Sequence, residues 1–153
     1  AYTTEIAGKY GYYILHGAKG DTTTWWGEKW KGKKLFSYPA AFKVHQANSR
    51  GIVLAGCCYG AYVIDKNPEN SICLAFLENG ARCFVGCTGK HYSTLRGSPN
   101  AKGQLFHKMF FTNLMGGKTP MQAFYETKVA YAARATYSSE KKIMHEFVYY
   151  GRP

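Results

Sequence analysis

Hydrophobic residues gather in four short runs, each of which ends at glycine or at a cluster of turn-forming residues. The runs are YGYYILHG at 10–17, GIVLAGC at 51–57, ARCFVGCTG at 81–89 and EFVYYGRP at 146–153. Apolar residues fill consecutive rather than alternate positions, so the pattern predicts strands that are buried on both faces. Such strands are typical of a largely parallel sheet with helices packed against each side.

A helix is expected between the second and third predicted strands. In NPENSICLAFLENG at 67–80, the apolar residues fall at helical spacing, Pro68 and Asn70 fit a helix start, and Gly80 fits a C-terminal cap. A strand, a helix and a second strand of this length predict a right-handed parallel crossover.

Two more helices are expected in the second half of the chain. One covers 103–115, and the next begins at the N-cap Thr119 with Pro120 in its first turn. The segments 18–50 and 88–102 are rich in Gly, Thr, Ser and Lys, and we predict them to be long loops. Loops of this length in an α/β domain often carry function.

Composition narrows the class of protein. Of 153 residues, 46% are hydrophobic and 19% are charged, which predicts one globular domain over 1–153 and excludes a disordered, collagenous or repetitive chain. The longest apolar stretch, at 52–64, is too short for a membrane span. The chain starts without Met or an apolar signal segment, so we interpret it as a processed piece of a larger protein.

The formal net charge of +11 raises nucleic acid, anionic membranes and acidic substrates as partners. Only KWKGKK at 29–34 forms a local basic run, and we interpret it as a solvated loop. The chain contains no RNP-like aromatic pair. We therefore expect no specific nucleic-acid partner.

Two reactive side chains follow neighbouring predicted strands. His16 ends the first run and Cys57 ends the second. Catalytic groups gather at the carboxyl ends of parallel strands, where an imidazole can activate a cysteine thiol as a nucleophile. The amides of Gly17 and Cys57 can then bind an oxyanion. Asp21 and Glu28, in the segment after the histidine, are candidates to orient it.

The cysteines do not predict a metal centre. Five cysteines cannot all pair within one chain, so at least one thiol is free. Cys57 and Cys58 are adjacent, and Cys83 and Cys87 are separated by three residues, which matches no paired zinc-ligand pattern. We expect neither a metal nor another cofactor.

The order of these motifs resembles that of cysteine peptidases of the caspase-hemoglobinase fold, and the gingipain-type branch in particular. HGAKGDTTTWW at 16–26 resembles the His-Gly element of that branch. AGCCYG at 55–60 resembles its Ala-Cys-x-x-Gly turn, with Cys57 and Gly60 in register. CHAT-type domains and separases share these two elements. The segments that follow also resemble that branch: SICLAFLENGARCFVGCTG at 71–89, GQLFHKMFFTNLMGGKTPMQAFYETK at 103–128 and FVYYGRP at 147–153.

The resemblance implies an α/β fold of three layers with a mostly parallel central sheet. It also implies a cysteine endopeptidase in which Cys57 attacks the scissile carbonyl, His16 protonates the leaving amine and water resolves the thioester. Cys58 is the alternative nucleophile, shifted by one residue towards the opposite face of the sheet. The further orienting or pocket residues under this interpretation are Asp21, Trp25, Trp26, Lys90, His91 and Tyr92.

Partners and location follow from the same resemblance. A peptide or protein is the expected substrate, and a secreted or cell-surface location is favoured. The family's sheet has one or two strands before the histidine strand, but only nine residues precede that strand here, so these strands either come from another segment or chain or do not exist. The competing hypothesis is an interaction module of the same fold that is non-proteolytic or processes only itself.

Overall fold

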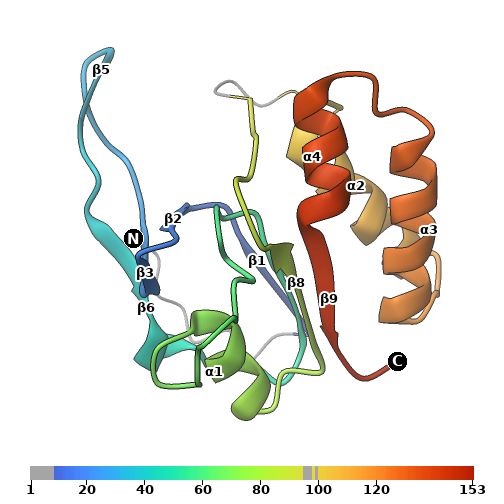
Figure 1. Cartoon of the computed structure of the whole chain (residues 1–153), viewed down its shortest axis with the longest axis horizontal. Helices are drawn as coiled ribbons and strands as arrows, with labels where there is room; N and C mark the ends of the chain where they lie inside the picture. The colour runs from blue at the N-terminus through green and yellow to red at the C-terminus, as the bar shows by residue number, and fades with distance from the viewer. Residues whose placement is uncertain (1–8, 95–97, 99) are drawn as a thin grey trace.

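Four strands form the central sheet of the computed structural model, which describes residues 9–94, 98 and 100–153. The first three strands are parallel, and the last runs antiparallel to its neighbour. Their order in the sheet is β1 (Tyr10–Tyr13), β7 (Ile52–Ala55), β8 (Cys83–Cys87) and β9 (Phe147–Gly151). Each predicted run therefore contains one strand of this central sheet. A mixed α/β fold with a mostly parallel sheet is confirmed (Figure 1).

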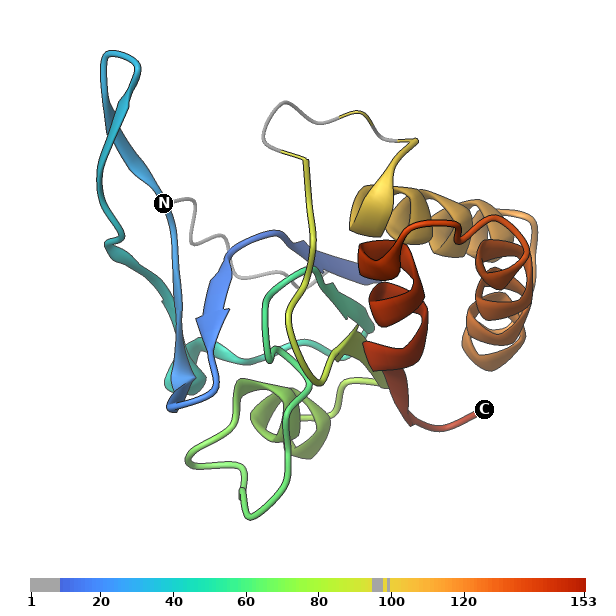
Figure 2. The ribbon, with the colours of Figure 1, turned by 45° about the horizontal axis from the view of Figure 1, so that its top comes forward.

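Helices pack against both faces of this sheet (Figures 1 and 2). One face is covered by α1 (Ile72–Glu78), which connects the parallel strands β7 and β8 as expected. The opposite face is covered by α2 (Lys102–Met115), α3 (Pro120–Ala132) and α4 (Ser138–Glu146). None of the described helices has both the length and the apolar character needed to cross a bilayer.

The helix ends show how the local sequence selects these elements. Ser71 caps α1 by accepting a hydrogen bond from the Leu74 amide at 3.4 Å, so the helix starts later than Pro68 and Asn70 predict. Gly80 adopts a positive φ of 96° just after the helix, as expected for a C-terminal cap.

The start of α3 agrees with the prediction. The Thr119 hydroxyl accepts from the Gln122 amide, and the Gln122 side chain accepts from the Thr119 amide, which together form a capping box. Pro120 occupies the first turn, where its missing N–H costs no helical hydrogen bond.

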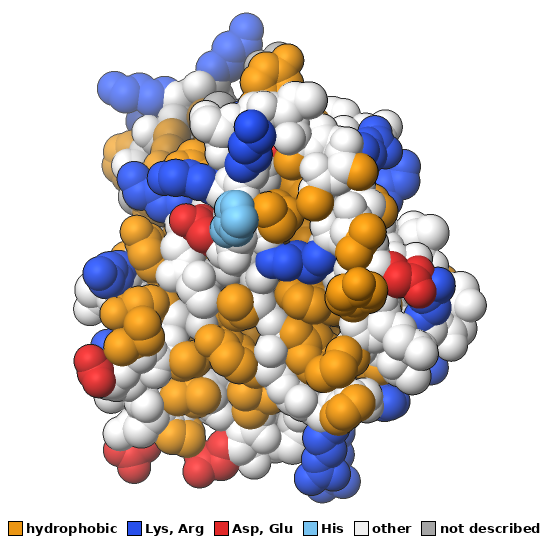
Figure 3. Space-filling view, turned by 45° about the vertical axis from the view of Figure 1, so that its right-hand side comes forward, with side chains coloured by type: hydrophobic (Ala, Val, Ile, Leu, Met, Phe, Trp, Pro, Cys, Tyr) orange, Lys and Arg blue, Asp and Glu red, His pale blue; other side chains and the backbone are white. Residues whose placement is uncertain are grey.

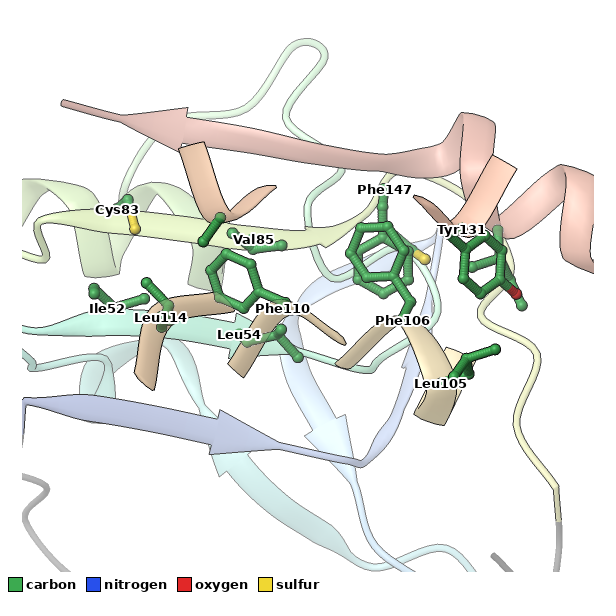
Figure 4. Packing of buried hydrophobic residues seen from close by; sticks show 13 residues of the cluster. Ile52, Leu54, Cys83, Val85, Leu105, Phe106, Phe110, Leu114, Tyr131 and Phe147 are labelled. Atoms are coloured by element: carbon green, nitrogen blue, oxygen red, sulfur yellow. The ribbon is translucent and has the colours of Figure 1, made fainter. Parts of the chain in front are cut away.

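Both faces of the two central strands are buried, as their continuous apolarity predicts. Every residue of β7 and β8 is buried, and alternate residues project to opposite faces of the sheet. Ile52, Leu54 and Val85 face the three-helix side, while Val53, Ala55 and Phe84 face α1. Figure 4 shows Phe106, Phe110 and Leu114 of α2 packed over the first of these faces.

The prediction of a long loop over 18–50 is wrong. This part of the chain folds into β2 (His16–Ala18), β3 (Asp21–Trp26), β4 (Lys29–Lys31), β5 (Lys34–Ser37), β6 (Ala40–Lys43) and a short 3-10 helix, η1 (Val44–Gln46). Strands β2, β3 and β6 form a second, antiparallel sheet, and β4 pairs only with β5 among the described strands. The Thr and Trp residues of DTTTWW are strand formers, a signal that the Gly and Lys content around them obscured.

The other long connection is closer to expectation. No helix or strand lies among the described residues between β8 and α2, although residues 95–97 and 99 of the predicted loop 88–102 lie outside the described part. Helix α4 was not predicted, because SSEKKIMHE is mostly polar. In the structure, Ile143 is the one residue of this helix that is buried.

Replacing Phe106 with Ala is expected to lower the free energy of unfolding by about 3–5 kcal/mol. Phe106 is fully buried, and its ring stacks on that of Phe147 with centroids 4.3 Å apart. Urea unfolding followed by circular dichroism measures the loss. Phe36→Ala is the control, because Phe36 is 69% exposed, and equal losses in the two variants would contradict this packing.

Candidate active site

The carboxyl ends of β1 and β7 meet at one edge of the central sheet. Tyr13 and Ala55, the last residues of the two strands, are register partners, and the Gly56 amide donates to the Tyr13 carbonyl at 2.7 Å. His16 and Cys57 follow these ends within three residues. The prediction that His16 ends the first strand is wrong. The chain leaves the central sheet after Tyr13, and His16 begins β2 of the second sheet.

The His-Gly segment lies directly against the double-cysteine turn. A Cβ atom on Gly17 would stand 2.0 Å from the carbonyl oxygen of Cys58, a separation that no side chain tolerates. Glycine at position 17 therefore permits the close approach of two segments that are far apart in sequence. This contact brings the neighbourhoods of both candidate catalytic residues together.

Glu28 is the carboxylate that holds the candidate histidine. His16 Nε2 lies 2.7 Å from Glu28 Oε1, and the other carboxylate oxygen accepts a hydrogen bond from the Trp30 indole at 2.8 Å. The hydrogen bond to His16, followed by that to Trp30, lowers the pKa of Glu28, so the carboxylate is charged at neutral pH. The imidazole is half exposed, and the edge of the Tyr38 ring packs against it.

Asp21, the other orienting candidate, is engaged elsewhere. Its Oδ1 accepts hydrogen bonds from the Thr23 amide at 2.9 Å and from the Thr23 hydroxyl at 2.6 Å. This local turn stabilises the start of β3. Of the two carboxylates that the sequence proposes, the structure therefore joins only Glu28 to the imidazole.

The two adjacent cysteines lie in different surroundings. Cys57 is completely buried among the residues that face α1, and this burial raises the pKa of its thiol well above the usual range. Cys58 is half-buried, and its thiol lies 3.6 Å from the His91 carbonyl oxygen. All five cysteines are free thiols. In this conformation Cys57 is therefore a protonated thiol shielded from solvent.

The turn after Cys57 is tied to the segment after β8. The Gly60 amide donates to the Cys57 carbonyl at 3.1 Å, and the Tyr59 amide donates to the Gly89 carbonyl at 2.6 Å. Tyr59 has a φ of 54°, in the left-handed region that costs a bulky residue about 1–3 kcal/mol. A strained backbone held by bonds to a neighbouring segment is a feature that often accompanies functional turns.

The resemblance implied that His91 and Tyr92 line a substrate pocket, but the structure turns both side chains towards the protein interior. The His91 imidazole is turned inward, with its Nε2 3.2 Å from His107 Nε2 and the two rings nearly parallel. Gly103 makes room for it, because a Cβ there would stand 2.2 Å from His91 Nε2. Tyr92 packs on the core beneath the three helices, while Lys90 is exposed.

His107 is the functional-looking residue that sequence reasoning missed. Its imidazole joins His91 to the hydroxyl of Tyr12, which lies 2.8 Å from His107 Nδ1. The sequence signal was Gly103, four residues earlier on the same face of α2. The space that Gly103 leaves on this face of α2, next to His107, is occupied by the His91 ring.

The two tryptophans occupy different positions. Trp25 is 2% exposed and stacks on Phe42 in the core, so it does not line a substrate pocket. Trp26 is half-buried and is the register partner of His16 across β2 and β3. The pairing of β2 with β3 therefore fixes the backbone of His16 within the second sheet.

The described residues of this region form no metal site. Within the described part of the chain, no group of three or more His, Cys, Asp and Glu side chains is arranged to hold a metal ion. A surface cavity of about 380 Å³ lies between α2 and α3, with Lys108, Asn113 and Glu126 in its lining and none of the candidate catalytic residues.

Comparison with protein-family models, curated proteins and solved structures found no match to this chain.

Acidification is expected to destabilise the fold through His91. Burial lowers the pKa of this imidazole from 6.5 to about 4, so below pH 6.5 the unfolded chain binds protons that the folded chain does not. The free energy of unfolding should fall by about 2 kcal/mol between pH 6.5 and pH 5 from this residue alone. Urea unfolding at both pH values tests this. His91→Gln should remove that part of the pH dependence, whereas the exposed control His45→Gln should retain it.

Proposed function

We propose that this protein is a cysteine endopeptidase of the caspase-hemoglobinase type, resembling the gingipain branch. The observation that carries the proposal is the contact of Gly17 with Cys58, which holds the His-Gly segment against the cysteine turn while Glu28 binds the imidazole. A thiol, an imidazole and a carboxylate at converging strand ends are the groups that nucleophilic acyl transfer requires.

Each residue has a defined role in the proposed reaction. His16 accepts the thiol proton as the Cys57 sulfur attacks the scissile carbonyl carbon, and the amides of Gly17 and Cys57 stabilise the resulting oxyanion. His16 then donates this proton to the leaving amine, and Glu28 keeps the imidazole oriented. Water then attacks the thioester, which releases the acid product and restores the thiol.

The described conformation corresponds to a closed form of the proposed enzyme. Cys57 has no exposed surface, and burial keeps its thiol protonated. Attack on a substrate therefore requires the neighbouring segments to separate. The segment after β8 is well placed to control this opening, because it is bonded to Tyr59 and faces the Cys58 thiol.

The edge of the central sheet fits the expectation of a further strand. Within the described residues, β1 pairs with β7 alone, so its other edge carries backbone groups available to a strand from elsewhere in a larger protein or from a second chain. Addition of such a strand next to β1 widens the central sheet.

Replacing Cys57 with Ala is expected to abolish peptide hydrolysis and labelling by a thiol-directed peptide probe, because the nucleophile is lost. Cys58→Ala is the matched control, since it removes the neighbouring thiol and should retain most of the activity. Turnover on an unbiased peptide library and mass spectrometry of the labelled residue measure both effects. Activity that survives Cys57→Ala and disappears in Cys58→Ala would shift the nucleophile by one residue.

Replacing Glu28 with Gln is expected to lower kcat by about tenfold with little change in KM, because the imidazole loses its charged partner but the binding surface remains. Asp21→Asn should leave kcat unchanged, because Asp21 bonds to Thr23 rather than to His16. Steady-state kinetics on the same peptide compares the two variants. Equal effects would remove Glu28 from the site.

A second candidate function is an interaction module that does not cleave other proteins or that processes only itself. The complete burial of Cys57 favours it, because a substrate in solution cannot reach the thiol without a conformational change. A lack of hydrolysis across the library, together with probe labelling only after unfolding, would select this alternative.

A further inference from the structure

The basic segment 29–34, predicted as a solvated loop, forms part of a projecting hairpin. We call β4, β5 and the turn between them the arm, residues 29–37. Its two strands pair with each other and with no other described strand, and they extend away from the body of the molecule (Figures 1 and 2). Gly32, at a positive φ of 59°, starts the tight turn that closes the hairpin.

Two lysines of the arm, one on each strand, lie directly across from each other. Lys31 and Lys34 are register partners, so their side chains project to the same side, while a register shift separates Lys29 from this regular part of the hairpin. Trp30 and Leu35, which pair with each other, project to the opposite side. The arm therefore has a cationic face and an apolar face.

The charge on the cationic face is not balanced within the part of the chain that the structure describes. The ion pairs found there are His16 with Glu28 and Lys118 with Glu126, and neither involves a lysine of the arm. Like charges placed directly across two strands destabilise them, and a two-stranded hairpin is marginal by itself. An anionic ligand would relieve the repulsion between Lys31 and Lys34 and stabilise the hairpin.

The base of the arm is built into the candidate active site. Glu28, just before β4, bonds both to His16 and to the indole of Trp30, and Tyr38, just after β5, packs its ring on His16. A ligand that follows the arm towards the body of the molecule therefore arrives at the candidate imidazole.

The wider surface differs from the arm. On the side of the molecule in Figure 3, Lys and Arg side chains are scattered around hydrophobic and uncharged ones and form no single dense patch. The arm combines an aligned pair of lysines, Lys31 and Lys34, with strand edges that have no backbone partner among the described strands. This combination favours an extended ligand over a small diffusible anion.

We propose that the arm binds acidic segments of polypeptides. A peptide strand can pair with the free edge of the hairpin and place its carboxylates beside the aligned pair Lys31 and Lys34. A nucleic-acid strand fits less well, because its bases would stack on Trp30 on one face while the aligned lysines needed for its phosphates lie on the other. If the proposed peptidase function holds, these acidic segments belong to its substrates.

The test measures binding in a chain that cannot cleave the ligand. In a Cys57→Ala background, fluorescence anisotropy reports binding of a labelled peptide of alternating Glu and Thr, the same peptide with Gln for Glu, and single-stranded oligouridylate of matched charge. The Glu peptide should bind most tightly. Replacing Lys29, Lys31 and Lys34 with Gln should weaken its binding by about tenfold, whereas Arg at the same positions should retain it.

A second lysine variant controls for total charge. Lys108, Lys141 and Lys142 are exposed on α2 and α4, so their replacement by Gln lowers the net charge of +11 by the same amount and should change binding less than about twofold. Equal losses in the two variants would overturn the arm as a site, and arm-dependent binding that is tighter for the oligonucleotide would overturn the polypeptide. Circular dichroism verifies that each variant is folded.

The outcomes for the arm and for the proposed function are separable. Arm-dependent binding of the Glu peptide by a chain whose wild type hydrolyses no peptide overturns the peptidase alone. Hydrolysis that depends on Cys57, without any arm-dependent binding, overturns the arm alone.

Discussion

The burial of β7 and β8 on both faces is the constraint on which the rest of the structure depends. Neither strand has a solvated side, so polar and reactive groups are driven to the strand ends, where the chain leaves the core. The parallel pairing of β1 with β7 then brings two such ends to one edge. Helices on both sides exclude water from the sheet. The strand ends lie together because the strands are paired.

Glycines convert this convergence into contact. Gly17 allows the Cys58 carbonyl to approach its Cα, and Gly103 leaves room for the His91 imidazole. Burial of the two histidines in turn connects the segment after β8 to α2 and, through Tyr12, to β1. Small residues thus determine how closely the backbone segments around the cysteine turn can pack, and neutral imidazoles fill the space that remains.

Prediction from the sequence succeeds where one kind of signal dominates. The four apolar runs and the cap of α3 at Thr119 were recognisable because hydrophobic burial and capping are encoded within a few residues. The second sheet was missed, since its strands draw on Thr and Trp residues set among Gly and Lys. The inward turn of His91 was also unpredictable, because it depends on a histidine sixteen residues away and on a glycine of another element.

The candidate site shows the same division. His16 and Cys57 were identifiable from their positions after strands, but the choice between Asp21 and Glu28 required the hairpin geometry that separates them. Glu28 also shares its two oxygens between His16 and Trp30, so one carboxylate connects the arm to the imidazole. Because the two hydrogen bonds share this carboxylate, a displacement of either Trp30 or His16 alters the bond to the other. The base of the arm and the imidazole are therefore linked through a single side chain, which no local sequence pattern can reveal.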